Sequence, residues 1–380
     1  MTNAVDFVVV GAGIAGASAA WELARQGRTV LLEREAQPGF HSTGRSAALF
    51  SETYGPPQVR ALSRASRAFL AHPPPGFAEQ PILTPRGTLV IGNPNDPGPL
   101  AGLQAELGAD AAVERWSRER TLAAVPVLRP ACTGEALHEP GAQDIDVYAL
   151  HQGFLRGLRR AGGELVCDAE VVGLVRESSG AWRVRIADGR QWLARRVINA
   201  AGAWADAIAA LAGVAAVGLQ PKRRSAFVFP PPADIDPRAW PMVLDVAESW
   251  YMKPDAGLLL GSPANADPVV AHDVQAEELD VAIAIDRIEQ ATTLTIRRPT
   301  RVWAGLRSFV ADGVPVVGER PDAPGFVWLA GQGGYGIQTC AAMAALAASV
   351  ALGRPLPEGL AVQGVSAQAL SPGRAGLHPR

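Results

Sequence analysis

Lysine is almost absent from this chain of 380 residues. Of its 35 basic side chains, only Lys222 and Lys253 are lysines. Codon usage that favours arginine would replace most lysines that can be replaced. Lys222 and Lys253 are therefore candidates for positions where arginine cannot replace lysine. The simpler alternative is that both are surface lysines that remain by chance.

Cysteine is also scarce, with Cys132, Cys167 and Cys340 far apart and no C-x-x-C pair among them. This spacing excludes a disulfide framework and a thiolate metal site. The histidines show no ligand spacing either, so we predict no metal.

Long apolar runs and excess charge are missing as well. The longest apolar stretch, 341–352, covers about 12 residues, which suits a buried helix and is too short for a membrane span. The first residues lack the basic segment of a secretory signal. A net charge of −2 gives no electrostatic footprint for nucleic acid. We expect a cytoplasmic protein, and peripheral contact with a membrane stays open.

Apolar residues make up 48% of the chain and charged residues 19%, which suffices for a large core and, at this length, two domains. The 40 glycines and 31 prolines follow no collagen-like period, so they indicate tight turns in a folded protein.

The chain opens with a strand–helix–strand pattern. An apolar strand at 7–10 leads into Gly11-Ala-Gly-Ile-Ala-Gly16, then a helix to about residue 26 and a second strand at 29–32. Gly11 makes the tight turn, Gly13 lets backbone approach a pyrophosphate, and Gly16 lets helix and strand pack closely. Glu33, 22 positions after Gly11, would bind ribose hydroxyls. This context predicts a dinucleotide site, against the alternative of a structural turn without ligand.

A second glycine-rich turn, Gly331–Gly336, is expected to open the last apolar helix. Helix amides there would stabilise negative charge on a reduced flavin ring, which favours FAD over NAD. The turn Asn199–Trp204 is a third place where backbone could approach the nucleotide.

The middle of the chain has a different pattern of predicted secondary structure. Between about 225 and 306, short strands alternate with proline-rich turns, and 277–290 reads as an amphipathic helix. We therefore predict an α/β (overall α+β) protein: a Rossmann-like nucleotide-binding domain of three segments, 1–88, 144–224 and 305–375, and a mixed-sheet substrate domain of 89–143 and 225–304.

Together these residues resemble the D-amino-acid oxidase type of flavoprotein, the group that includes glycine and sarcosine oxidases, and most of all the FAD-dependent D-arginine dehydrogenases. The resemblance covers about residues 5–370. It is specific in Leu32–Ala48, Leu219–Phe227, Lys253–Gln275, Trp303–Gly313 and Gly331–Thr339. It implies the fold of the glutathione-reductase-2 and D-amino-acid oxidase type and a non-covalent FAD.

The motifs and the resemblance assign one set of residues to the cofactor. The residues predicted to bind FAD are Gly11, Gly13, Ile14, Ala15, Gly16, Glu33, Arg34, Ser42, Thr43, Gly44, Arg45, Ser46, Ala47, Ala48, Leu49, Val171, Ala201, Gly202, Trp204, Gly333, Gly334, Tyr335, Gly336, Ile337 and Gln338.

A second set would surround the substrate. The resemblance places there Tyr54, Arg224, Tyr251, Arg307, Gly334 and Gln338, together with Thr88 and Leu49. An arginine fork matches a planar carboxylate. The activity implied is oxidative deamination of D-amino acids to 2-oxo acids and ammonia, by hydride transfer from Cα to flavin N5. Electrons would then pass to an acceptor other than O₂, such as a quinone.

Two positions depart from the relatives that prefer basic D-amino acids. Those relatives carry an acid at the position of Thr88 and a histidine at that of Leu49. Because Thr88 supplies no charge for a buried guanidinium, we expect a preference for neutral or apolar D-amino acids.

Other interpretations stay open. They are an oxidase that uses O₂, of the D-amino-acid or the glycine/sarcosine type, a true D-arginine dehydrogenase, and a non-catalytic flavin-bearing subunit. Since some relatives use a lysine beside the flavin in oxygen chemistry, Lys253 is a candidate for that role.

Overall fold

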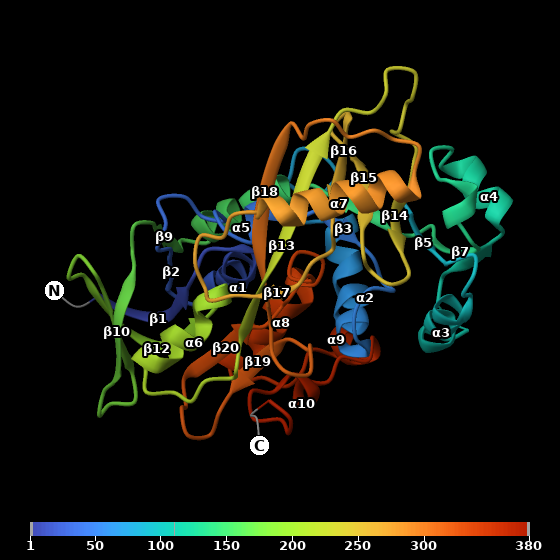
Figure 1. Ribbon diagram of the computed structural model, residues 1–380. Helices are drawn as coiled ribbons and strands as arrows, with labels where there is room; N and C mark the ends of the chain where they lie inside the picture. Colours follow the sequence, from blue (N-terminus) through green and yellow to red (C-terminus); the bar gives the residue numbers. More distant parts are fainter. Residues whose placement is uncertain (1–2, 110, 378–380) are drawn as a thin grey trace.

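The computed structural model describes residues 3–109 and 111–377, with two large sheets and a small one (Figure 1). The helices are α1 Ile14–Ala24, α2 Pro57–Ala71, α3 Gly98–Leu107, α4 Arg118–Ala124, α5 Val147–Arg160, α6 Ala205–Leu211, α7 Glu278–Ala291, α8 Cys340–Ala351, α9 Glu358–Val362 and α10 Ala367–Leu370, with 3₁₀ turns at Thr43–Arg45, Pro130–Cys132 and Gly202–Trp204.

The strands lie before and between these helices along the chain, singly or in runs of up to five. They are β1 Asn3–Val10, β2 Thr29–Leu32, β3 Leu49–Phe50, β4 Leu83–Pro85, β5 Thr88–Ile91, β6 Glu114–Trp116, β7 Ala136–Glu139, β8 Gln143–Ile145, β9 Glu164–Val166, β10 Val171–Arg176, β11 Trp182–Ile186, β12 Gln191–Asn199, β13 Gln220–Phe229, β14 Met242–Asp245, β15 Tyr251–Asp255, β16 Leu258–Ser262, β17 Asp267–Pro268, β18 Arg301–Phe309, β19 Val316–Glu319 and β20 Phe326–Ala330.

The first sheet has a parallel centre. Strand β1 pairs in parallel with β2 and β12, β2 with β9, and β12 with β20. β2 and β20 are buried along their whole length, as expected for parallel strands that are covered on both faces. Helices α1, α5 and α8 pack together beside this sheet. The antiparallel strands β10 and β11 extend it beyond β12.

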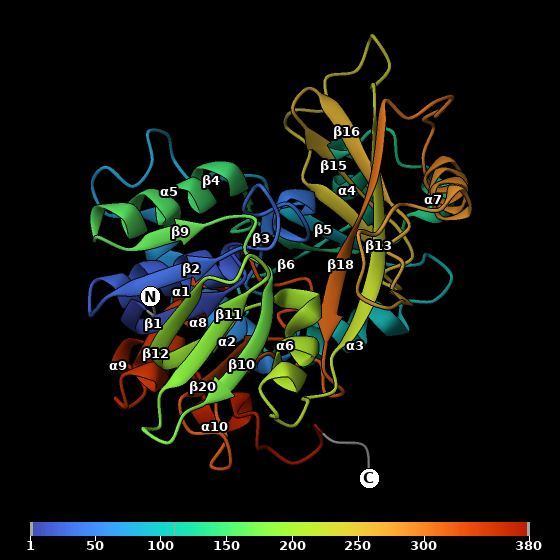
Figure 2. The ribbon, with the colours of Figure 1, turned by 90° about the vertical axis from the view of Figure 1, so that its left-hand side faces the viewer.

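The second sheet is mixed and gathers strands from distant parts of the sequence. Its order is β17-β13-β16-β15-β14-β5-β7-β6, and the long strand β18 pairs antiparallel with β13. Figure 2 shows this sheet beside the first one, with α7 on its outer side. Ala284 and Ile288 of α7 are fully buried against it.

The third sheet is small and has the strand order β3-β8-β4, with strands from three separate places in the sequence. It pairs Leu49 of β3 with Asp144 of β8. Lys253 of β15 donates to this Asp144 at 2.7 Å, and Arg86, just after β4, donates to its other carboxylate oxygen at 2.7 Å. An ion cluster of the buried Lys253 with the half-buried Asp144 and Arg86 therefore joins the second sheet to the third.

The predicted fold class, an α/β nucleotide-binding fold with an additional mixed sheet, is confirmed. One local prediction is wrong: the Gly331–Gly336 turn does not open the last helix directly, because α8 begins only at Cys340. The domain boundaries remain a prediction. Within the described ranges, no helix combines the length and apolar character needed to cross a membrane.

Candidate active site

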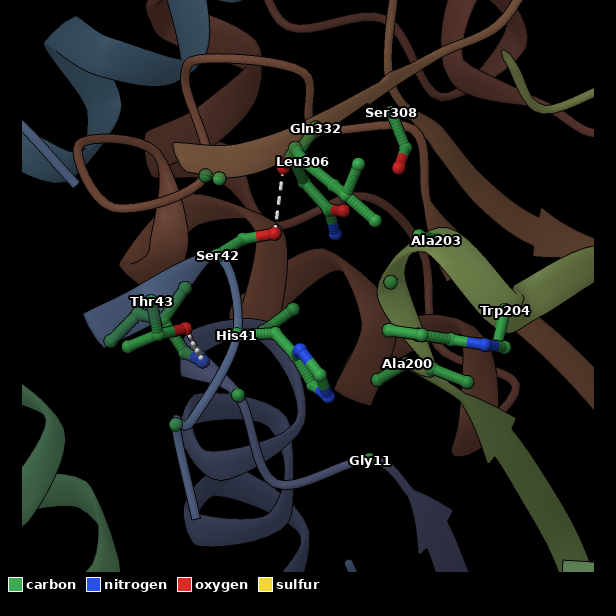
Figure 3. A pocket seen from close by; sticks show the side chains of 18 of the residues that line it. Gly11, His41, Ser42, Thr43, Ala200, Ala203, Trp204, Leu306, Ser308 and Gln332 are labelled. Carbon is green, nitrogen blue, oxygen red and sulfur yellow. Dashed lines mark hydrogen bonds between the residues drawn. The ribbon is translucent and has the colours of Figure 1, made fainter. Parts of the chain in front are cut away.

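A cavity of about 390 Å³ opens at the carboxyl end of β1, where α1 begins. Its floor is the glycine-rich turn, and its other walls come from the 39–47 loop, the turn after β12, strand β18 and the Gly331–Gly336 turn. Figure 3 shows these walls converging, with Gly11 and Ala200 on one side and Leu306, Ser308 and Gln332 opposite them.

Glycine is required in the first turn for reasons of space. Gly11 has φ +96°, and a Cβ there would lie 2.6 Å from the carbonyl oxygen of Ala200. A Cβ on Gly16 would lie 1.8 Å from the carbonyl oxygen of Gly11. Gly16 itself does not line the cavity. Its part is the close packing of α1 on the turn, as the motif predicts.

Glu33 stands at the end of β2 and braces this turn. Its Oε2 accepts from the amide of Ala12 at 2.8 Å, and its Oε1 accepts from the amide of Glu35 at 3.0 Å. The carboxylate lines the cavity and is 9% exposed. Each oxygen keeps further acceptor capacity, so the predicted contact with ribose hydroxyls fits this geometry.

The 39–47 loop is held against two other walls (Figure 3). Thr43 accepts from the amide of Ile14 at 3.0 Å, and Ser42 donates to the carbonyl of Leu306 at 2.6 Å. The loop also reaches the turn after β12: His41 packs on the Trp204 ring with 4.7 Å between ring centres, and the Arg34 guanidinium lies 4.3 Å from the centre of the same ring.

Two observations test whether these residues fit FAD. Gly13 lines the cavity, so its backbone can meet a close ligand, and a Cβ there would also crowd Thr43, at 3.2 Å from its Oγ1. Gln332 lines the same cavity, and its buried Nε2 has no hydrogen-bond partner among the described residues. An unpaired buried donor is costly, and a cofactor oxygen would satisfy it. The residues fit the group.

The prediction of the cofactor residues can be compared with this cavity. All but six of the residues predicted to bind FAD line it. Ala48, Leu49 and Gln338 line only a neighbouring cavity, and Gly16, Gly44 and Tyr335 line neither.

That neighbouring cavity has a volume of about 460 Å³ and shares a wall with the first. All eight residues predicted for the substrate line it. The residues lining both cavities are Ser46, Ala47, Arg224, Tyr251, Arg307, Gly334 and Ile337. A molecule in the second cavity can therefore reach one held in the first.

Two guanidinium groups mark the shared wall. Arg307 of β18 packs over Gly334, where a Cβ would lie 2.9 Å from its Nη1, and donates to the Tyr54 hydroxyl at 3.4 Å. Arg224 of β13 donates through Nε to the carbonyl of Asn265 at 2.5 Å. This bond leaves both terminal nitrogens of Arg224 without a protein partner among the described residues.

The electrostatics of the pair follow from this placement. Burial and the nearby charge of Arg307 lower the pKa of Arg224. Burial works against the charge of Arg307 as well, but Tyr54 and Tyr251 outweigh it and raise its pKa. Two neighbouring cations favour an anionic ligand group between them.

Away from the shared wall, the second cavity is lined by both apolar and ionisable side chains. Its walls include Leu103 and Leu107 of α3, Val90 of β5, and Leu244 of β14. Thr88 lies in this part of the second sheet, 5% exposed, directly opposite Glu139 in the neighbouring strand. Glu106 of α3 pairs with Arg60 at 2.9 Å, and both line the cavity.

The role of Lys253 beside the flavin stays a prediction. The side chain is 4% exposed and paired with Asp144, and it lines neither cavity. Lys222 also lines neither, and its Nζ lies 5.4 Å from the Phe309 ring centre.

Sequence reasoning missed several cavity residues. Leu306, Ser308 and Gln332 in the first cavity flank predicted residues, so extending the motifs by one position would have found them. Glu139 in the second cavity has no local signal, because it reaches the wall only through the pairing of β7 with β5. In the described chain, no group of acidic, histidine or cysteine side chains could hold a metal ion.

A cavity at a glycine-rich turn, joined to a second cavity by a wall that carries two guanidinium groups, fits a flavin-linked oxidoreductase. The chain matches the family described as FAD dependent oxidoreductase over residues 6–350. It belongs to this family and is an enzyme with FAD as its cofactor.

Individual relatives are distant. The chain is 25% identical over 359 residues to "Glycine oxidase" of Geobacillus kaustophilus, covering 89% of this chain and 90% of that protein. It is 26% identical over 237 residues to "Hydrogen cyanide synthase subunit HcnC" of Pseudomonas aeruginosa, a match that spans 60% of this chain but only 53% of that protein. The structure of iminodiacetate oxidase from Chelativorans sp. BNC1 superposes with a TM-score of 0.82 at 24% identity, covering 96% and 98% of the two chains. It shares the fold.

Proposed function

We propose that this enzyme deaminates D-amino acids with neutral, mainly apolar side chains, giving 2-oxo acids and ammonia, and passes the electrons to an organic acceptor such as a quinone. The observation that carries the proposal is the division of the second cavity. Two guanidinium groups lie on the wall shared with the FAD cavity, and apolar side chains of α3, β5 and β14 line the cavity away from that wall.

The cationic end suits an amino-acid carboxylate. The free fork of Arg224 and the guanidinium of Arg307 can both donate to it, and a charge-assisted hydrogen bond is worth about 1.5–3 kcal/mol. The Tyr54 hydroxyl beside Arg307 offers a further donor. Binding there fixes the substrate Cα at the wall next to the cofactor, and much of the rate enhancement would come from this orientation.

FAD, when bound, supplies a two-electron acceptor for the hydride that leaves Cα. The protein's part is to hold the substrate and keep water from the shared wall during hydride transfer; water then hydrolyses the imino acid product to the 2-oxo acid and ammonia. Tyr251, 5% exposed, closes the shared wall. The amine must be neutral to release the hydride, and the cations at this wall favour its neutral form.

The distal end suits an uncharged side chain. Three of the acids in its lining have protein partners: the buried Glu139 accepts from Ser51 and Thr53, the half-buried Asp245 accepts from Ser249, and Glu106 pairs with Arg60. Glu248, which also lines the cavity, is exposed. Thr88 brings no charge. A volume of about 460 Å³ also exceeds what glycine needs, which favours a substrate with a side chain over the substrate named for glycine oxidase.

Anaerobic mixing with single amino acids tests the proposal. We expect D-Leu, D-Met or D-Phe to bleach the flavin absorbance, with kcat/KM for these above that for D-Arg. A large advantage for D-Arg, or bleaching only by glycine or sarcosine, would contradict it. Stoichiometric peroxide in air would show O₂ as the acceptor instead.

A further inference from the structure

Glu139, at the end of β7, is a buried acid in the wall of the second cavity. It accepts from the Ser51 hydroxyl at 2.7 Å, the Glu52 amide at 2.8 Å and the Thr53 hydroxyl at 2.7 Å. One carboxylate thus binds three consecutive residues that immediately precede Tyr54.

No cation accompanies this charge. Glu139 is 4% exposed, and in 3–109 and 111–377 it has no ion-pair partner within 4.0 Å. A buried carboxylate is stable only when hydrogen bonds replace its hydration. The three donors of the 51–53 segment provide them, so the segment and the acid stabilise each other.

The same segment is fixed from its other side. Gln338, 2% exposed, accepts from the Ser51 amide and donates to the Ser51 carbonyl, both at 3.1 Å. Its Nε2 also donates to Ser63 at 2.8 Å. The Gln338 amide is therefore occupied within the protein, and its part is to hold Ser51.

Tyr54 follows this doubly held segment directly. Its ring packs edge-on against Tyr335, with 5.1 Å between ring centres, and its hydroxyl accepts from Arg307. Gly55 comes next, with φ +90° and no room for a side chain against Tyr335. The position of the Tyr54 hydroxyl depends on where the chain leaves Thr53.

We propose that Glu139 is a positioning residue for substrate binding: its carboxylate holds the Ser51–Thr53 segment so that Tyr54 meets Arg307 at the carboxylate end of the cavity. Glu139 acts through Tyr54 and does not contact the reacting atoms. The inference rests on the proposed function only in taking Tyr54 and Arg307 as substrate-binding groups.

A double-mutant cycle tests the proposal in the FAD-loaded enzyme. Glu139→Gln keeps the shape but loses the charge, and we expect it to raise KM on the order of tenfold with kcat changed by less than about threefold. In a Tyr54→Phe background the same change should have a much smaller effect, because the group it positions is gone. Glu135→Gln is the control, since Glu135 pairs at the surface with Arg115 just before β7.

Hydrogen exchange gives a reading that needs no substrate. In Glu139→Gln the amides of 51–54 should exchange faster than in the wild type, while the melting temperature and FAD content stay close to those of the control. Thr53→Val removes one donor and keeps the acid. If Glu139→Gln does not fold, this variant carries both measurements.

The outcomes separate the two proposals. Unchanged exchange at 51–54, or equal effects of Glu139→Gln with and without Tyr54, would overturn the positioning role. A wild type whose flavin no D-amino acid bleaches would overturn the proposed function alone. The cycle would then use whichever amine does bleach it, and the exchange result would stand.

Discussion

The two joined cavities are built in different ways. The first takes much of its wall from three glycine-containing turns, the start of α1 and the 39–47 loop, where small residues leave main-chain groups within reach of a ligand. The second is walled by side chains. Among them are Arg224 of β13, Arg307 of β18, Glu139 of β7 and Tyr54 in the segment after β3.

This difference corresponds to what each cavity must do. A backbone wall suits a cofactor of fixed shape, because main-chain donors and a helix N-terminus bind phosphate regardless of nearby side chains. A side-chain wall can change with the substrate while the fold stays the same. Family membership therefore defines the cofactor of this chain, and the substrate depends on individual residues.

The largest effect is expected at the backbone cavity. Gly16→Ala puts a Cβ 1.8 Å from the Gly11 carbonyl oxygen, so α1 must move off the turn. We expect destabilisation of more than about 3 kcal/mol and loss of FAD. Thermal unfolding and flavin absorbance measure both effects.

Gly102→Ala in α3 is the matched control, because a Cβ there meets nothing within 4 Å. It should be neutral or slightly stabilising. A Gly16→Ala protein that keeps FAD and its melting temperature would break the idea that this cavity depends on backbone contact.

The next effect tests the side-chain cavity. Arg307→Met removes one of the two cations and should lower kcat/KM by about 100-fold, since a charge-assisted bond to the substrate is lost. Flavin absorbance should persist, because the first cavity has many other walls. Arg307→Lys, which keeps the charge but loses the fork, should recover only part of the loss.

Loss of FAD from Arg307→Met would show that cofactor binding in the first cavity depends on a side chain of the second. That result would contradict the contrast drawn between the two cavities. Arg301→Met at the exposed start of the same strand serves as the control.

The same contrast explains how far the sequence could be interpreted. The Gly11–Gly16 turn and Glu33 could be predicted because their roles depend on residues close in sequence, and local spacing encodes them. The long pairing of β13 with β18 brings Arg224 to the level of Gly305, and no local pattern reports that register. Those arginines were found through resemblance.

Other features were hidden for physical reasons. Glu139 is a single acid on a short strand, and only its burial beside Ser51 and Thr53 sets it apart. Lys253 stood out by its rarity in the composition, which says nothing about its burial beside Asp144. The start of α8 was placed too early because the Gly331–Gly336 turn continues irregularly to Thr339 before a helix forms.

A smaller effect concerns the distal end of the second cavity. Thr88→Glu adds an acid opposite Glu139. We expect the ratio of kcat/KM for D-Arg to that for D-Leu to rise on the order of tenfold, limited by repulsion between the two acids. Thr88→Gln, of equal size without charge, should leave the ratio nearly unchanged. Steady-state kinetics with both substrates decides it, and equal ratios in the two variants would contradict the assignment of Thr88 to the distal end.

The smallest effect returns to the backbone cavity. His151 of α5 is 4% exposed, and its Nε2 lies 2.9 Å from the carbonyl of Ala12 in the first turn. Burial lowers the pKa of His151. Below the ordinary histidine pKa of about 6.5 the unfolded chain binds a proton that the folded chain does not, so stability falls as the pH drops below that value. Between pH 7 and pH 5 we therefore expect His151 to contribute part of the loss of stability. In His151→Gln, which can still donate to Ala12, the decline in unfolding temperature over that range should be shallower. An identical decline in both proteins would show that His151 does not contribute to the pH dependence of stability.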